Sequence, residues 1–174
     1  MKKVLLGILL LIFSLSSCTE SNEIACPVTY TVVTGDFELQ STWRLVGFVN
    51  RNEGRMNYPP CETYLLAGNT VETYPLLLTF TQEAAEGRRS ASQFLTFRGN
   101  GPVNDFSGAY ALQGDQITVG EVFDSSEAEA VGVVGEYEQR YFDALQRMNR
   151  YKITNNMLTI FGDGGEELTF VHLF

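Results

Sequence analysis

Few side chains of this 174-residue chain are suited to bond-making chemistry, because it contains three cysteines and one histidine. The cysteines stand at positions 18, 26 and 61, and His172 lies near the C-terminus. A tetrahedral zinc site needs four ligands, and a histidine base needs both a nucleophile and an orienting group. The sequence supplies neither set, so we expect no catalytic residues, no metal site and no cofactor.

Cys18 has a different chemistry available to it. Residues 1–17 begin with Lys2 and Lys3 and continue with an apolar run that is too short to span a bilayer, which is the pattern of a signal peptide. The run ends in Leu15-Ser16-Ser17-Cys18, which resembles a bacterial lipobox. We therefore expect cleavage before Cys18 and acylation of its thiol; the alternative is an ordinary signal peptide with an incidental cysteine. Acyl chains would anchor the protein without a spanning helix.

Cys26 and Cys61 would then be the two thiols left in an oxidising compartment, where disulfides persist. They allow one intramolecular pairing, and closing the loop between them would stabilise the fold by about 3–4 kcal/mol. We predict a disulfide between Cys26 and Cys61. Two free thiols are the alternative.

Composition and charge exclude several classes of partner. The chain has 12 basic and 21 acidic residues, for a net charge of −9, and removal of Lys2 and Lys3 with the signal peptide makes it more acidic still. Nucleic-acid binding needs clustered cations, and so does attraction to anionic lipid. A hydrophobic content of 44% is enough for a core. We expect a monomeric domain that binds no nucleic acid and meets the membrane through its lipid.

The pattern after the signal peptide predicts a short tether and then one domain. We assign residues 18–40 to the lipidated tether and a short N-terminal segment, and residues 41–174 to the domain. Within the first part, 28–33 is expected to be either a short strand or a segment pinned by Cys26. The stretch 50–74 is rich in turn residues and indicates a long loop or insertion.

Alternating apolar residues predict a largely antiparallel sheet. Strands are expected at 43–49, 76–81, 94–98, 106–112 and 116–123, followed by a meander over 151–170. Apolar residues at helical spacing predict one helix over Glu136–Met148. The fold class is therefore α+β.

Three polar features have plain structural explanations. His172 is expected to be exposed or on an edge strand, and the acidic turn Asp163–Glu167 lacks the spacing of a calcium loop. Four glutamates before and within the helix suggest a solvated acidic face: Glu127, Glu129, Glu136 and Glu138.

The segment from Asn104 to Tyr110 carries the most specific pattern in the chain. Asn104-Asp105-Phe106-Ser107-Gly108-Ala109-Tyr110 resembles the N-x-(F/Y)-x-G-x-Y block of the META/HslJ-like domain family of bacterial envelope lipoproteins. Trp43 and Leu45 resemble the W-x-L start of that family, and further matching positions follow at Glu138, Tyr141, Leu145, Tyr151, Ile153, Leu158 and Leu168. The resemblance covers about Ser41–Phe174. Two family cysteines are absent, since Val103 occupies one position and Ser125–Ala130 contains no cysteine.

The resemblance implies a strongly curved, barrel-like sheet with one packed helix and no established enzymatic activity. It also implies a link to envelope stress. We expect structural roles for the motif residues Trp43, Asn104, Gly108 and Tyr110, with the side chain of Asn104 bonding the backbone of its own turn.

The functional expectation is a non-enzymatic envelope lipoprotein that acts in stress response or assembly through contacts with an envelope protein. Thr19 stands where an aspartate would resemble an inner-membrane retention signal, which favours the outer membrane. The alternative is a lipoprotein that binds a small apolar ligand or peptide, as a lipocalin or pilotin does. An apolar cavity inside the sheet would favour that alternative, and a filled interior would not.

Overall fold

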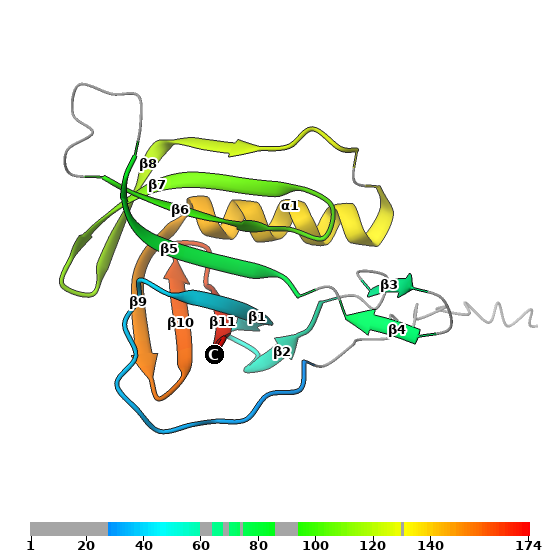
Figure 1. Ribbon diagram of the computed structural model, residues 1–174, viewed down its shortest axis with the longest axis horizontal. Helices are drawn as coiled ribbons and strands as arrows, with labels where there is room; N and C mark the ends of the chain where they lie inside the picture. Colours follow the sequence, from blue (N-terminus) through cyan, green and yellow to red (C-terminus); the bar gives the residue numbers. More distant parts are fainter. Residues whose placement is uncertain (1–27, 60–63, 68–69, 74, 86–93, 130) are drawn as a thin grey trace, which may run out of the picture.

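Eight antiparallel strands of the computed structural model close into a barrel (Figure 1). The structure describes residues 28–59, 64–67, 70–73, 75–85, 94–129 and 131–174. The barrel strands are β1 (Thr42–Asn50), β5 (Leu77–Ala84), β6 (Leu95–Asn100), β7 (Asp105–Gln113), β8 (Gln116–Ser125), β9 (Met148–Thr154), β10 (Met157–Gly162) and β11 (Glu166–His172). The barrel closes because β1 pairs with both β5 and β11. The predicted α+β, barrel-like fold is confirmed.

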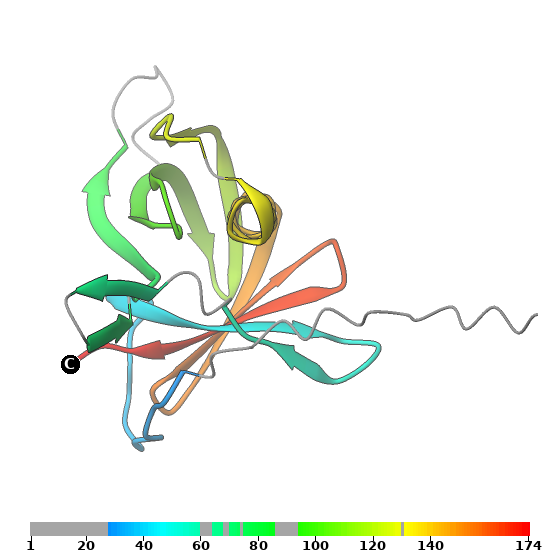
Figure 2. The same cartoon turned by 90° about the vertical axis from the view of Figure 1, so that its right-hand side faces the viewer.

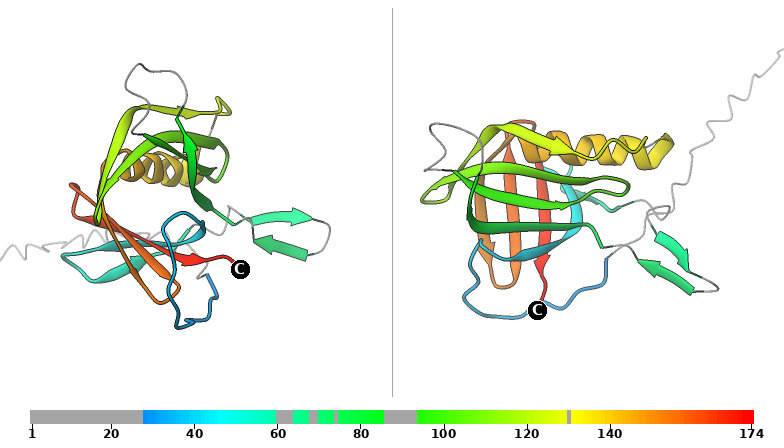
Figure 3. Two further views of the ribbon diagram at one scale, coloured as in Figure 1. Left: turned by 60° about the vertical axis from the view of Figure 1, so that its left-hand side comes forward. Right: turned by 45° about the horizontal axis from the view of Figure 1, so that its top comes forward.

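The insertion after β1 contains three short strands. β2 (Arg55–Asn57) pairs with the end of β1, while β3 (Tyr64–Ala67) and β4 (Thr70–Thr73) form a separate hairpin beside the barrel (Figure 3). The sequence did not predict these strands, because the region is rich in turn residues and strands of three or four residues show little apolar alternation.

One helix, α1 (Gly132–Gln146), is present in the described part of the chain. It begins and ends earlier than predicted, and Met148 belongs to β9. The first turn contains Gly132 and Gly135 with two valines, which are poor helix formers. Tertiary packing therefore extends the helix beyond its amphipathic segment. This helix is not long and apolar enough to cross a membrane, and no other described segment provides one that is.

The helix lies where β8 and β9 separate (Figure 2). Their ladder consists of the pair Gln116 and Arg150. Beyond it, Phe142 of α1 packs on Phe123 of β8, with ring centroids 5.4 Å apart, and Tyr141 packs on Phe170 of β11 at 6.5 Å. The helix thus completes one side of the barrel wall.

Side chains fill the interior of the barrel. Aromatic rings dominate and contact one another from strand to strand, with centroid separations of 5.0 Å for Phe80 and Tyr110 and 6.1 Å for Phe80 and Phe97. The largest fully buried side chains are Trp43, Tyr110, Tyr141, Phe48, Phe80, Phe97, Phe170, Leu45, Leu78, Leu145, Leu158 and Ile160.

The segment 28–33 forms no strand. It is held against the barrel by the side chain of Asn156. The Asn156 side chain accepts a bond from Val33 N (2.8 Å) and donates to Thr31 O (2.8 Å). The expectation of a strand at 28–33 is therefore not met, and pinning by Cys26 stays a prediction. Cys26, the proposed source of it, lies outside the described residues, as do Cys18 and Cys61.

Candidate functional site

Asn104 and Glu138 form a buried polar network between the loop before β7 and the helix. Glu138 Oε2 accepts hydrogen bonds from the backbone N–H groups of Val103 and Asn104, both at 2.8 Å. Glu138 Oε1 accepts a bond of 2.6 Å from Asn104 Nδ2. Both side chains are buried. The prediction that Glu138 belongs to a solvated acidic face is wrong.

The opposite side of the Asn104 amide holds the loop before α1. Asn104 Nδ2 donates to Ala128 O (2.9 Å), and Oδ1 accepts bonds from Ala128 N and Ser126 Oγ, both at 2.8 Å. The sequence context predicted that the Asn104 side chain bonds the backbone of its own turn. Its hydrogen bonds go instead to Glu138, Ser126 and Ala128, so this prediction is wrong. Asn104 connects two loops to one helix, and its amide donates and accepts in fixed directions.

The other motif residues lie inside the barrel wall. Trp43 is fully buried and donates from Nε1 to Leu39 O at 2.9 Å. Tyr110 donates from its hydroxyl to Thr81 O at 2.7 Å, and burial raises its pKa. A Cβ added at Gly108 would lie 2.3 Å from Cζ of Phe97, so the closeness of that ring requires glycine. None of these three residues lines either groove described below.

His172 is neither exposed nor on an edge strand. It lies in β11 opposite Trp43 of β1, and its backbone N–H donates to Asn156 O on the other side. Its ring lies 5.2 Å from that of Trp43 and 5.1 Å from that of Phe174. Closure of the barrel gives β11 two neighbours, which the strand pattern alone does not reveal.

The imidazole of His172 also meets a serine. Its Nε2 is 2.6 Å from Ser41 Oγ, whereas Nδ1 is buried and has no hydrogen-bond partner among the described residues. Nδ1 lacks a partner among these residues in either tautomer, whether it carries the proton or the lone pair. The direction of the Nε2–Ser41 hydrogen bond follows the tautomer: Nε2 donates when it is protonated and accepts when it is not. Burial also lowers the pKa of His172.

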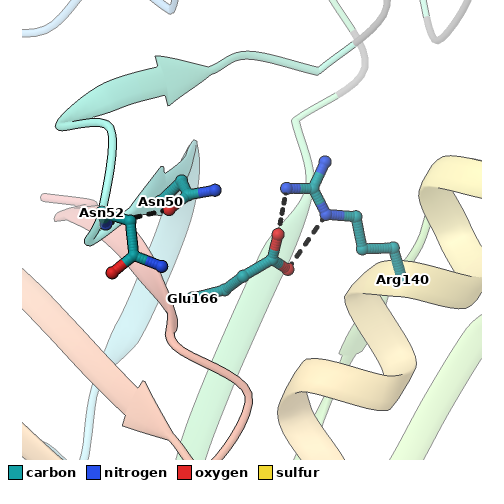
Figure 4. Close-up of polar contacts among 4 residues, drawn as sticks. All are labelled: Asn50, Asn52, Arg140 and Glu166. Atoms are coloured by element: carbon teal, nitrogen blue, oxygen red, sulfur yellow. Dashed lines mark hydrogen bonds and ion pairs between the residues drawn. The ribbon is translucent and has the colours of Figure 1, made fainter.

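A groove of about 550 Å³ runs between α1 and strands β10 and β11. We call it the helix groove; its lining includes Arg140, Asp143, Arg147, Ile160 and Glu166. Figure 4 shows Arg140 reaching from α1 to Glu166, with two hydrogen bonds to the carboxylate, the one from Nε measuring 3.0 Å. The guanidinium also lies 4.5 Å from the ring centroid of Phe48.

The charges of the helix groove are largely matched within it. Arg147 pairs with Asp143 one turn away at 3.6 Å, and Arg140 pairs with Glu166. On the neighbouring turn after β1, Asn52 N donates to Asn50 Oδ1 (2.9 Å), which orders that loop (Figure 4). The side chains that line this groove therefore hold the helix against the barrel, and they present little unpaired charge.

A second groove, of about 520 Å³, lies where the turn between β7 and β8 meets β9 and β10. We call it the strand groove. Its lining consists of Gly114, Asp115, Arg150, Tyr151, Lys152, Ile153 and Phe161. The guanidinium of Arg150 lies 4.5 Å from the ring centroid of Phe161. Sequence reasoning did not select any of these residues as a site.

The described residues contain no cluster of three or more histidine, cysteine or acidic side chains able to hold a metal ion. In the acidic turn, Glu166 and Glu167 are instead committed to Arg140 and Arg51. Their carboxylates thus join the beginning of β11 to α1 and to the turn after β1.

Two solved structures resemble this chain. An NMR structure of a protein from Burkholderia xenovorans is 19% identical and has a TM-score of 0.56, with 85% of this chain and 97% of that one covered. A crystal structure of a DUF4847 family protein from Bacteroides vulgatus ATCC 8482 is 16% identical with a TM-score of 0.48, covering 78% and 94%. The first likeness concerns the fold alone. No curated protein matches the chain.

The family comparison agrees with the motif. The META domain model matches residues 64–173, a span that includes Asn104, Gly108, Tyr110 and Glu138. It begins after Trp43, later than the start at Ser41 suggested by the sequence motif. The matched span is more than half of the chain, and the chain therefore belongs to the META domain family.

Proposed function

We propose that this chain is a non-enzymatic lipoprotein of the bacterial envelope, anchored through Cys18, that acts in envelope stress or assembly by contacting another protein. The observation that carries this proposal is the filled barrel interior. Trp43, Phe80, Phe97 and Tyr110 are each at most 1% exposed, so side chains occupy the place where a lipocalin-like protein would hold an apolar ligand.

The positions of the motif residues support the same proposal. Trp43, Asn104, Gly108 and Tyr110 all serve contacts within the domain, which leaves the outer surface to carry recognition. Both grooves lie on that surface. The Ser41–His172 pair adds no support for hydrolysis, because Nδ1 of His172 meets no group among the described residues that would orient the imidazole as a base.

The test is photo-crosslinking in intact cells. A photo-crosslinking residue is placed at exposed positions around the barrel, with the same residue in place of the buried Phe97 as a control that presents no surface. We expect discrete protein adducts from a subset of exposed positions and none from the buried one. Lipid adducts alone from every exposed position would contradict action through protein contacts.

Anchoring is tested separately by Cys18→Ala. We expect this variant to remain unprocessed and unlabelled by a fatty-acid probe, while Cys26→Ala and Cys61→Ala retain the label. Labelling that persists in Cys18→Ala would contradict the anchor but leave the protein contacts unaffected.

A further inference from the structure

The strand groove is a place where an acidic chain presents cations without partners. Arg150 and Lys152 are two residues apart on β9, so their side chains leave the same face of the sheet, and both are exposed. Neither forms an ion pair within the part of the chain that the structure describes. Asp115 supplies the one carboxylate of the groove lining.

The guanidinium of Arg150 is positioned before any partner arrives. It lies over the ring of Phe161 at 4.5 Å, and Arg51 lies 5.2 Å from the centroid of the same ring. Arg51 is itself held by Glu167, with Nε 2.6 Å from Oε1. An arginine stacked on an aromatic ring has less conformational freedom to lose on binding than a free one.

The groove also offers apolar surface beside its charges. Phe161 is half-buried and lies on the same face of the sheet as Arg150 and Lys152. Tyr151 and Ile153 alternate to the opposite face and pack against the barrel core. Aromatic residues and arginine are enriched in protein interfaces relative to the rest of the surface. Rigid aromatic surface next to unpaired cations is therefore suited to a ligand that carries both carboxylates and an apolar group.

We propose that the strand groove binds a short acidic peptide segment of a partner protein, with an apolar side chain among its carboxylates. A carboxylate of the segment accepts two parallel hydrogen bonds from Arg150 and a second carboxylate meets Lys152. The apolar side chain contacts Phe161, which lies on the same face of the sheet as the two cations. This inference rests on the proposed function, because it names the face and the partner chemistry of those protein contacts.

A short segment fits the charge of the whole domain better than an anionic membrane does. The chain has a net charge of −9, so an extended negative surface would face repulsion wherever it approached the rest of the barrel. Repulsion is screened beyond about 8 Å at physiological salt. A peptide segment enters the groove while its own protein stays outside that distance.

The test uses the full-length chain in mild detergent and a fluorescein-labelled six-residue peptide of alternating glutamate and phenylalanine. Anisotropy at low salt reports binding. We expect the double variant Arg150→Glu, Lys152→Glu to weaken binding at least about tenfold. Arg150→Lys keeps the charge but loses the planar, stacked group, and is expected to weaken binding about threefold.

The matched control is the double variant Arg55→Glu, Arg98→Glu. Both residues are exposed, on β2 and β6, and the change in net charge is the same. We expect less than a twofold effect on peptide binding. Equal losses in the two double variants would overturn the inference by showing attraction to overall charge, and no loss in either would exclude the groove. Binding to vesicles of anionic lipid that requires Arg150, without peptide binding, would overturn the partner class.

Crosslinking in cells separates this inference from the proposed function. A photo-crosslinking residue replaces Lys152 in one strain and Arg55 in another. Protein adducts from Arg55 but none from Lys152 would overturn the groove and leave the proposed function standing. If no exposed position yields a protein adduct, the proposed function fails, whatever the peptide does in solution.

Discussion

The helix groove and the strand groove are nearly equal in volume, at about 550 and 520 Å³, and share strand β10. Ile160 lines the first and Phe161 the second, so consecutive residues of one strand serve opposite faces. Both grooves combine arginines with apolar side chains. What distinguishes them is whether their charges have partners within the domain.

In the helix groove the principal cations are paired. Arg140 bonds Glu166 and covers Phe48, and Arg147 pairs with Asp143, so these side chains hold α1 against the barrel. In the strand groove Arg150 and Lys152 have no acidic partner among the described residues. The pairing of charge, rather than the size of a groove, thus separates a structural joint from a candidate binding surface.

The largest effect should come from Glu138→Gln, which loosens the helix that forms one wall of the helix groove. A glutamine has one carbonyl oxygen for three donors, and its own amide N–H₂ faces one of them. We expect the free energy of unfolding to fall by about 2 kcal/mol. Urea denaturation measures it.

The control is Glu136→Gln, on the exposed side of the same helix, with an expected change below about 0.5 kcal/mol. Peptide binding at the strand groove should persist in Glu138→Gln under conditions in which the variant is folded. Equal stability of the two variants would show that the buried network does not hold the helix.

The sequence predicts the barrel well where contacts are local. The hairpin of β7 and β8 and the meander of β9, β10 and β11 follow from alternation and from turn residues such as Gly114, whose φ is +65°. Closure of the barrel does not follow. It requires β1 to pair with β11, more than a hundred residues later in the chain, and strand patterns carry no information on such partners.

The buried hydrogen-bond network of Asn104 and Glu138 could not be predicted either, because it joins side chains that are far apart in the sequence. Asn104 and Glu138 are 34 residues apart. Asparagine and glutamate are usually exposed, so neither residue alone indicates a buried site. The strand groove was not predicted as a site either, although one of its contacts is local in the sequence. A two-residue turn at Asn155 and Asn156 places Arg150 opposite Phe161, so the register of a predicted hairpin already indicates that stacked pair.

A smaller effect is expected from the same substitution in each groove. Arg140→Met removes two hydrogen bonds to Glu166 and the cation–π contact with Phe48, from a pair that is about one-third exposed. We expect a loss of about 1 kcal/mol in unfolding free energy. Arg150→Met removes no ion pair with any described residue, and methionine still covers Phe161, so its stability should change by less than about 0.5 kcal/mol.

Peptide binding should show the reverse order. Arg150→Met is expected to weaken it and Arg140→Met to leave it unchanged, as measured by anisotropy on the same preparations. A stability loss in Arg150→Met as large as that in Arg140→Met would mean that both arginines are structural, and the contrast between the grooves would disappear.

The smallest effects are expected from the carboxylates, Asp143 in the helix groove and Asp115 in the strand groove. Asp143→Asn removes one exposed ion pair with Arg147 and should lower unfolding free energy by about 0.3 kcal/mol. Asp115→Asn leaves intact the backbone bond from Tyr151 N to Asp115 O, so stability should not change measurably. Removing the one carboxylate of the strand groove should, however, strengthen binding of the acidic peptide about twofold, because it removes a repulsive charge beside Arg150. Weaker binding in Asp115→Asn would mean that this carboxylate serves the ligand, and hence that the groove recognises a cation rather than an acidic segment.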